Sequence, residues 1–145
     1  MRTHVRYPIA LATSFLWIGF IGAISFMEAW LKFQAPGITV PLGLGIGRLV
    51  FSALNKVEWV LALIILGNFV VGKAHFSSPR TILYAIPLTL LVLQTVWLLP
   101  ALNVRVELLL QGQEPENSYL HLYYEGIEIC KVVCLSLLGT KLFKR

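Results

Sequence analysis

The sequence predicts an all-α integral membrane protein: a four-helix transmembrane bundle with a short amphipathic or re-entrant helix between helices one and two. Hydrophobic residues make up 57% of the 145 residues, charged residues only 13%, and the mean hydropathy is +0.77. Soluble domains are typically about 45–50% apolar and about 25% charged. The same composition excludes disordered, coiled-coil and disulfide-rich classes. We expect one membrane domain over residues 1–145.

Four apolar stretches come close to the roughly 20 residues that a helix needs to cross a bilayer. The predicted spans are residues 8–31, 57–72, 81–102 and 119–142. Only Glu28 interrupts the first span, the second is short unless the preceding helix feeds into it, and the fourth is the least apolar. Lipid cannot satisfy exposed backbone groups, so the spans should be helical. No stretch alternates as the strands of a membrane barrel do.

The segment 32–56 should connect the first two spans by a turn and a short helix. Proline and glycine at Pro36, Gly37 and Pro41 predict an irregular turn. From about residue 46 the pattern becomes helical, with Arg48 and Asn55 on one face. That pattern is typical of a helix lying at the outer interface or re-entering the bilayer. Polar composition and a proline make the connection 111–118 a loop.

The basic residues predict the orientation of the chain. Three segments that fall on one side of a four-span protein carry seven positive charges and no acid: Arg2, Arg6, Lys73, Arg80, Lys141, Lys144 and Arg145. The positive-inside rule then places both termini in the cytoplasm of a bacterial inner (plasma) membrane. Although Arg2 and Arg6 precede an apolar run, that run is long for a signal peptide, so we expect a retained span. The bases should bind lipid headgroups, and we find no nucleic-acid motif.

Polar side chains of all four spans gather in the half of the bundle predicted to face outward. The candidate ligand-binding residues are Glu28, Arg48, Asn55, Glu58, Gln94, Arg105, His121, Tyr124, Glu125, Glu128 and Lys131. Charges inside a membrane are costly and commonly functional, so their convergence predicts a site. In the fourth span, positions 121, 125 and 128 lie on one helical stripe that can point into the bundle. Cys130 and Cys134 fall on the opposite face and suit apolar packing.

Three interpretations of these polar residues remain open. They could form buried ion pairs that lock the helices together. They could hold a metal, with His121, Glu125, Glu128 and Glu58 as ligands for iron, manganese or zinc. They could line an outward-facing pocket for a cation, a proton, a quinone or another small ligand. No catalytic residues can be assigned, because the sequence has no Ser-His-Asp order, HExxH, CxxC or P-loop.

The layout loosely resembles two groups of small four-helix bacterial membrane proteins. Residues 28–32 at the end of the first helix, the amphipathic piece and Val57-Glu58 resemble the DoxX-like group, which is associated with quinone-linked roles. Leu99-Pro100 resembles the end of helix three in a set of uncharacterised four-helix proteins. Neither resemblance extends through residues 121–131, so no functional residue is carried over.

We therefore expect a small membrane protein that binds or transports a cation, a proton or a small ligand through its polar pocket. A transporter of this size would be a homo-oligomer. A membrane-embedded metal or quinone-linked redox enzyme is the second hypothesis. A non-catalytic subunit of a larger membrane complex is the third.

Overall fold

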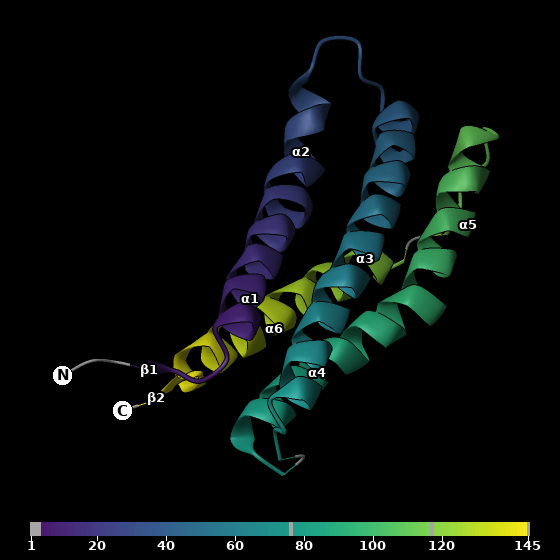
Figure 1. Cartoon of the computed structure of the whole chain (residues 1–145). Coiled ribbons are helices and arrows are strands. Elements are labelled where there is room, and N and C mark those ends of the chain that lie inside the picture. Colours follow the sequence, from purple (N-terminus) through teal and green to yellow (C-terminus); the bar gives the residue numbers. More distant parts are fainter. Residues whose placement is uncertain (1–3, 76, 117, 145) are drawn as a thin grey trace.

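The computed structural model describes residues 4–75, 77–116 and 118–144, and these form four helical rods (Figure 1). The first rod joins α1 (Pro8–Ile21), the π-helix η1 (Gly22–Glu28), α2 (Ala29–Leu31) and the 3₁₀ turn η2 (Lys32–Gln34). The second is α3 (Val40–Val71). The third joins α4 (Pro79–Leu93), the π-helix η3 (Gln94–Leu98) and α5 (Leu99–Leu110), and the fourth is α6 (Leu120–Lys141). Three of them, Pro8–Gln34, Val40–Val71 and Pro79–Leu110, are long and apolar enough to cross a membrane.

Local sequence signals explain where the rods begin and end. Prolines stand in the first turns of α1, α3 and α4, where a missing N–H costs no hydrogen bond. Thr39 caps α3 by accepting a bond from the backbone N–H of Leu42, and Ser78 caps α4 in the same way. Gly37 and Gly112 adopt positive φ values of 81° and 78° in the turns that follow the first and third rods.

The prediction of a separate short helix between the first two spans is wrong, because residues 40–71 form one helix of 32 residues. Pro41 occupies the first turn instead of breaking the helix. Gly43 and Gly47 are buried within α3, where their missing side chains let the first rod approach. The third rod likewise continues past residue 102 to Leu110.

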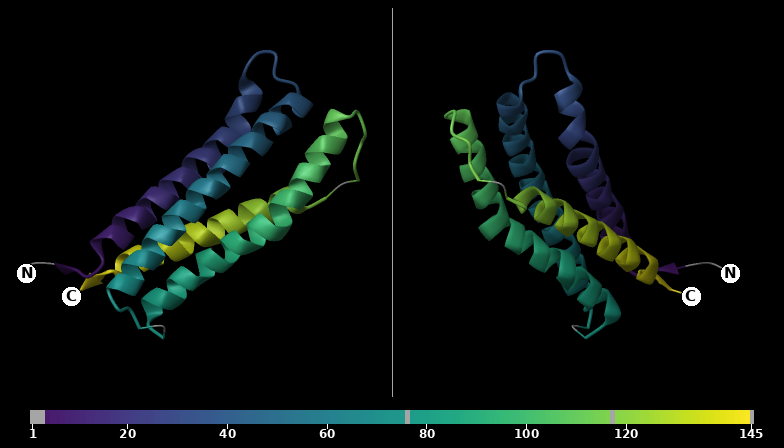
Figure 2. Two further views of the ribbon diagram at one scale, coloured as in Figure 1. Left: turned by 45° about the vertical axis from the view of Figure 1, so that its right-hand side comes forward. Right: turned by 180° about the vertical axis from the view of Figure 1, so that it is seen from behind.

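The rods run up and down, with α6 crossing the others at a tilt (Figure 2). Both described chain ends meet at one end of the bundle, where β1 (His4–Val5) pairs antiparallel with β2 (Phe143–Lys144). We call this the terminal end, and the opposite end, with the 35–39 and 111–116 connections, the distal end. At 1.5 Å per residue α3 is about 48 Å long and α6 about 33 Å. The helix α6 therefore leaves part of the distal end uncovered.

Two apolar cores fill the bundle. The larger core lies in the terminal half and includes Trp17, Ile65, Leu91, Leu135 and Leu138, all fully buried. The smaller core lies toward the distal end and consists of Phe51, Leu54, Leu98, Leu102 and Tyr124. Many large hydrophobic side chains lie outside both cores and are exposed on the surface of every rod. An exterior this apolar is typical of a surface covered by lipid.

A buried charge network beneath an aromatic pocket

Five polar side chains from all four rods form a network in the middle of the bundle. They are Trp17, Glu58, Gln94, Glu128 and Lys131, from α1, α3, η3 and α6, and none has any exposed surface. We call this set the charge network. Unpaired buried charges are very unfavourable, so the contacts within the network decide its stability.

Lys131 is the centre of the charge network. Its Nζ donates to Oε1 of Glu58, to Oε1 of Gln94 at 2.6 Å, and lies 3.1 Å from Oε1 of Glu128. An ammonium group has three N–H donors, and here two of them are hydrogen-bonded while Glu128 adds an ion pair. These contacts fit a positively charged lysine.

The two carboxylates of the charge network are each bonded through one oxygen only. Oε1 of Glu58 also accepts from the indole N–H of Trp17 at 2.8 Å, and Oε1 of Glu128 accepts from Nε2 of Gln94 at 2.8 Å. Oε2 of both glutamates is buried without a hydrogen-bond partner. Two carboxyl groups thus share one ammonium, and each keeps one unused oxygen.

A neutral hydrogen-bond cluster lies beside the charge network, between α3 and η3. The hydroxyl of Thr95 accepts from Nδ2 of Asn55 and from the indole N–H of Trp59, both at 3.0 Å. The same hydroxyl lies 2.7 Å from the carbonyl oxygen of Leu91, one turn earlier. Through these bonds Asn55 joins α3 to the third rod, so its amide has a structural role.

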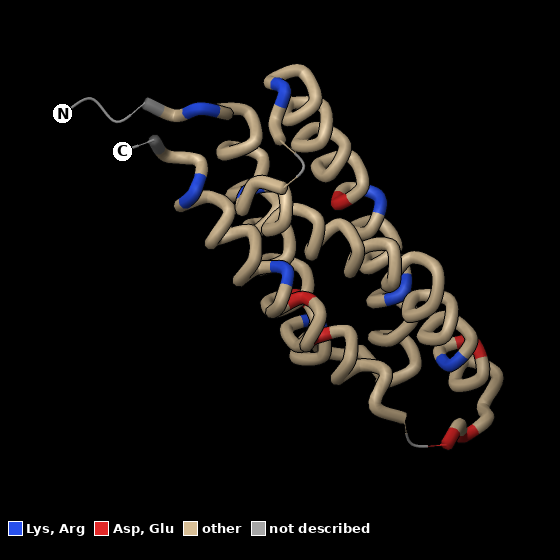
Figure 3. The backbone as a smooth tube through the Cα atoms, turned by 90° about the horizontal axis from the view of Figure 1, so that it is seen from below, with Lys and Arg blue, Asp and Glu red and all other residues tan. Residues whose placement is uncertain are grey.

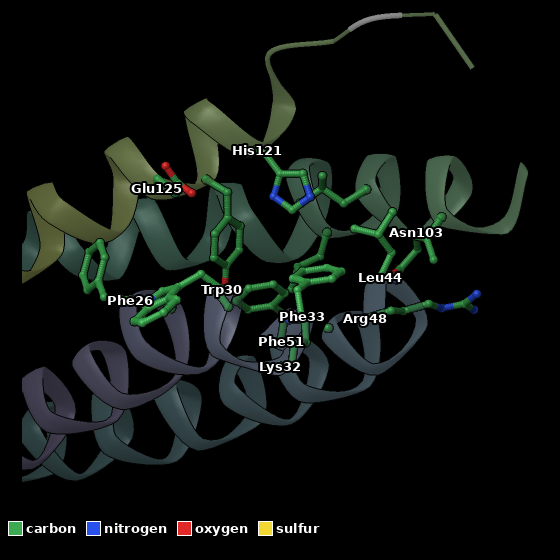
Figure 4. Close-up of a pocket in the computed structure, with 17 residues that line it drawn as sticks. Phe26, Trp30, Lys32, Phe33, Leu44, Arg48, Phe51, Asn103, His121 and Glu125 are labelled. Carbon is green, nitrogen blue, oxygen red and sulfur yellow. The ribbon is translucent and has the colours of Figure 1, made fainter. Parts of the chain in front are cut away.

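A pocket of about 270 Å³ opens on the distal side of the charge network (Figure 4). The first rod, α3, α5 and α6 all contribute to its wall. Its lining is largely apolar and aromatic, with a set of polar side chains: Phe26, Trp30, Phe33, Phe51 and Tyr124, together with Ser25, Lys32, Arg48, Asn103, His121 and Glu125. An apolar cavity with a few converging polar groups is the usual form of a small-molecule site.

Lys32 is the more enclosed of the two basic side chains in the pocket. Its side chain is only 10% exposed and pairs with Glu28 at 3.2 Å. Its Nζ also lies 5.4 Å and 5.6 Å from the ring centroids of Phe33 and Phe51, within the range of cation–π attraction. Gly47 leaves the room for this lysine, because a Cβ there would lie 3.0 Å from Nζ.

Arg48 is the more accessible basic side chain of the pocket, with 38% of its side chain exposed. It comes from α3, and Figure 4 shows it at the side of the pocket beyond Leu44. Its only ion pair among the described residues is a loose one, 3.8 Å from exposed Glu107. An exposed pair at that separation holds the guanidinium weakly, which leaves it available to an incoming group.

Ser25 and Tyr124 connect the pocket with the charge network. Both line the pocket and both are buried, with 4% and 2% of their surface exposed. The side chain of Tyr124 lies beside Glu128, Glu58 and Ser25. Oγ of Ser25 is buried and has no hydrogen-bond partner. The floor of the pocket is therefore polar and borders the two carboxyl groups.

Both π-helical segments lie at the level of these two features. Ser25 and Phe26 belong to η1, while Gln94 and Thr95 belong to η3. A π-turn inserts one residue into a helix and rotates the side chains that follow it, and such turns are frequent at functional sites. Here they turn Ser25 into the pocket floor and Gln94 into the charge network.

The structure divides the sequence-predicted residues between three places. Glu58, Gln94, Glu128 and Lys131 form the charge network, while Arg48, His121, Tyr124 and Glu125 line the pocket. The remaining three lie in other contacts. Glu28 pairs with Lys32, Asn55 bonds to Thr95, and Arg105 donates to the backbone carbonyl of Glu116 in the loop before α6.

The four residues considered as metal ligands are not gathered at one point. His121 and Glu125 are exposed residues at the pocket, whereas Glu58 and Glu128 are buried around Lys131. Across residues 4–75, 77–116 and 118–144, no three His, Cys, Asp or Glu side chains are placed to hold a metal ion. Glu58 and Glu128 are thus ion-paired with Lys131, whereas His121 and Glu125 line the pocket.

The candidate residues predicted from the sequence did not include Trp17, Ser25, Lys32 or the phenylalanines that line the pocket. Nothing distinguishes Trp17 in an apolar span, because its role depends on a partner 41 positions away. Lys32 carries a weak signal: it lies four residues after Glu28, a spacing at which oppositely charged side chains meet on a helix.

Comparison with known proteins gives no match: no protein-family model, curated protein or solved structure matches this chain.

Proposed function

We propose that this chain is a four-span membrane protein whose distal pocket binds a small amphipathic ligand on the outer side of a plasma membrane. The pocket carries this proposal, because aromatic side chains and basic side chains meet there around about 270 Å³ of open space. The fold, the surface and the charge distribution support the membrane arrangement.

The pairing of β1 with β2 supports α6 as the fourth span. A chain that crosses a bilayer three times leaves its ends on opposite sides, yet Val5 pairs with Phe143. The charges that make α6 less apolar are largely internal, since Glu128 and Lys131 have no exposed surface. Its outer face instead carries an exposed apolar stripe at four-residue spacing: Ile129, Val133 and Leu137.

The charge distribution supports a cytoplasmic terminal end. Its described charged residues are all basic, namely Arg6, Lys73, Arg80 and Lys141, while the acids lie further along the rods and in the distal loop (Figure 3). Basic residues are retained on the cytoplasmic side of bacterial inner membranes. The pocket then opens near the outer interface, where an amphipathic molecule can enter from lipid or from water.

The chemistry of the lining indicates the class of ligand. Phe26, Trp30 and Phe33 offer a surface for an aromatic ring or a short chain. Lys32 and Arg48 are cationic donors, and the amide of Asn103 adds a neutral one. A ligand with an apolar body and an anionic or hydrogen-bond-accepting head satisfies both parts of the lining.

Binding of a matched pair of probes tests the proposal. Naphthoate and naphthalenemethanol share one ring system, but only naphthoate carries a negative charge. We expect saturable binding of naphthoate to the purified protein by titration calorimetry, with the alcohol about tenfold weaker. The double variant Lys32→Gln, Arg48→Gln should reduce that preference to nearly none. Absence of saturable binding by either probe would refute the ligand pocket.

Cysteine accessibility tests the four-span arrangement separately. Single cysteines placed at Ser77 and Lys141 should react from the cytoplasmic side only, and one at Gln113 from the outer side only. Cys130→Ser, Cys134→Ser provides the background. Labelling of positions 77 and 141 from opposite sides would rule out α6 as a span, whatever the probes bind.

A further inference from the structure

We infer that the charge network is a proton-binding site, in which Glu58 and Glu128 together hold one exchangeable proton that passes through Tyr124 to the distal pocket. Proton binding by the charge network does not rest on the proposed ligand function. Only the path by which the proton exchanges with solvent runs through the pocket. The inference rests on the charges, the hydrogen bonds and the two unused oxygens of the network.

The first argument is the balance of charge. Glu58 and Glu128 are two carboxyl groups, and Lys131 is the one cation paired with them within residues 4–75, 77–116 and 118–144. In the part of the chain that the structure describes, the other ionisable side chain packed against the network is Tyr124 of α6, which is neutral when its phenol is protonated. The residues from α1, η1 and η3, namely Trp17, Ser25 and Gln94, carry no charge. Two ionised carboxylates would leave a net negative charge with no exposed surface, whereas one proton makes the network neutral.

The second argument is the pattern of hydrogen bonds. Oε1 of Glu58 accepts hydrogen bonds from Trp17 and Lys131. Oε1 of Glu128 accepts one from Gln94 and lies 3.1 Å from Nζ of Lys131. Neither oxygen therefore has room for a proton of its own. Both Oε2 atoms are buried and have no partner. A proton on one Oε2 removes the negative charge from a carboxyl group whose Oε2 has no donor beside it, and leaves the bonds through Oε1 unchanged. Lys131 already fills the space between the two Oε1 atoms, which disfavours a metal ion there.

The third argument is access. Tyr124 lines the pocket and lies beside Glu128, and its hydroxyl can both donate and accept. A proton reaches Oε2 of Glu128 when the tyrosine O–H passes its proton to that oxygen and the phenol oxygen takes the excess proton of a hydronium ion in the pocket, which leaves as neutral water. No charge is left on Tyr124 after this exchange. The partnerless hydroxyl of Ser25 offers a second group on the same path.

A one-to-one ion pair would suffice if the network only joined helices. Glu58 and Lys131 alone already connect α3 with α6, and Trp17 adds α1. The second carboxyl group adds buried negative charge, which a purely structural pair does not need. Proton binding accounts for its presence.

Infrared spectroscopy of the full-length protein in lipid nanodiscs tests the inference directly. A protonated carboxyl group gives a C=O stretch well separated from carboxylate bands, and this stretch shifts in heavy water. At neutral pH we expect about one such group per chain, because neutrality of the network requires one proton. Wild-type protein without this band would overturn the inference, and no variant is needed for that result.

Variants of the charge network then locate the proton. Glu58→Gln and Glu128→Gln should each abolish the band, since one carboxylate with Lys131 is already neutral. Lys131→Met should raise it to about two groups per chain, since two carboxylates without a cation need two protons. Glu114→Gln, an exposed loop residue, is the control and should leave the band unchanged. A band that survives both glutamine substitutions would place the proton elsewhere and refute the assignment.

The route is tested by the rate of the heavy-water shift. Tyr124→Phe should keep the band and slow its shift by about tenfold or more, because it removes the relay hydroxyl. Bound naphthoate should slow the wild-type shift in the same way. An unchanged rate in Tyr124→Phe would overturn the route. If naphthoate does not bind but the band is present, the ligand proposal fails and the proton site stands.

Discussion

The terminal and distal halves of the bundle differ in how much of α6 packs against them. In the terminal half α6 packs on α1 and α4, and large apolar side chains such as Leu135 and Leu138 are completely buried. In the distal half only the first turns of α6 are present, and α5 diverges from it (Figure 2). The few turns of α6 at this end do not close the space between the other rods, so a pocket remains there.

The charge network lies at the boundary between these halves. Glu58 is 13 residues from the terminal end of α3, or about 20 Å along the helix. At this level side chains of all four rods join in one buried network. The close packing of the terminal half therefore stabilises the bundle, and the pocket of the distal half is open to small molecules. The ionisable groups are buried where the two halves meet.

The largest expected effect on stability comes from removing the cation of the charge network. Lys131→Met leaves two buried carboxyl groups without their cation, and we expect a loss of about 3–5 kcal/mol in unfolding free energy. The measurement is equilibrium unfolding of the protein in mixed micelles with increasing denaturing detergent. Lys56→Met, an exposed lysine on α3, is the control and should change stability by less than about 0.5 kcal/mol. Equal stability of the two variants would mean that the network is not a closed, dry site.

The sequence predicted which face of a helix a polar residue occupies better than it predicted where along the helix axis its contacts lie. The stripe of His121, Glu125 and Glu128 follows from 3.6 residues per turn, and all three positions do lie on the inner side of α6 or at its edge. Seven residues separate His121 from Glu128, however, which is about 10 Å along the axis. That distance places one residue at the open pocket and the other in the closed network, so a single predicted site became two.

Other features depended on contacts that no local pattern contains. Gly43 and Gly47 leave room for Phe33 and Lys32 of the first rod, a role that helix propensity, which disfavours glycine, does not reveal. The role of Trp17 depends on Glu58 in another rod. Composition and apolar stretches were sufficient to predict four helical rods, because those depend on the chain's own hydropathy.

Matched leucine truncations give the second-largest effect and compare the two cores. Leu135→Ala removes a fully buried side chain from the terminal core, and we expect a loss of about 3–5 kcal/mol. Leu102→Ala lies at the edge of the pocket and is 7% exposed, so its loss should be nearer about 1–2 kcal/mol. Both are measured by the same unfolding assay. A larger loss for Leu102→Ala would contradict the loose packing of the distal half.

Filling the pocket should separate binding from stability. Ala29→Leu adds bulk to the pocket wall, and we expect naphthoate affinity to fall by at least about tenfold while the unfolding free energy changes by less than about 1 kcal/mol. Ala53→Leu, on the exposed side of α3, adds the same group outside the pocket and should leave binding unchanged. Calorimetric titration of both variants makes the comparison. Unchanged affinity in Ala29→Leu would place the bound probe elsewhere.

The smallest effect on stability is expected at the rim of the distal half. Arg48 and Glu107 are 3.8 Å apart and partly exposed, so the pair should contribute less than about 1 kcal/mol. Glu107→Gln removes only this partner of the arginine and lies outside the pocket lining. Stability should hardly change, while naphthoate affinity should rise about two- to fivefold, because the guanidinium no longer has a competing carboxylate. High salt should reduce that gain, since screening weakens exposed charge interactions. A fall in affinity would instead show that Glu107 holds Arg48 in its binding position, and would make the rim a preorganised part of the pocket.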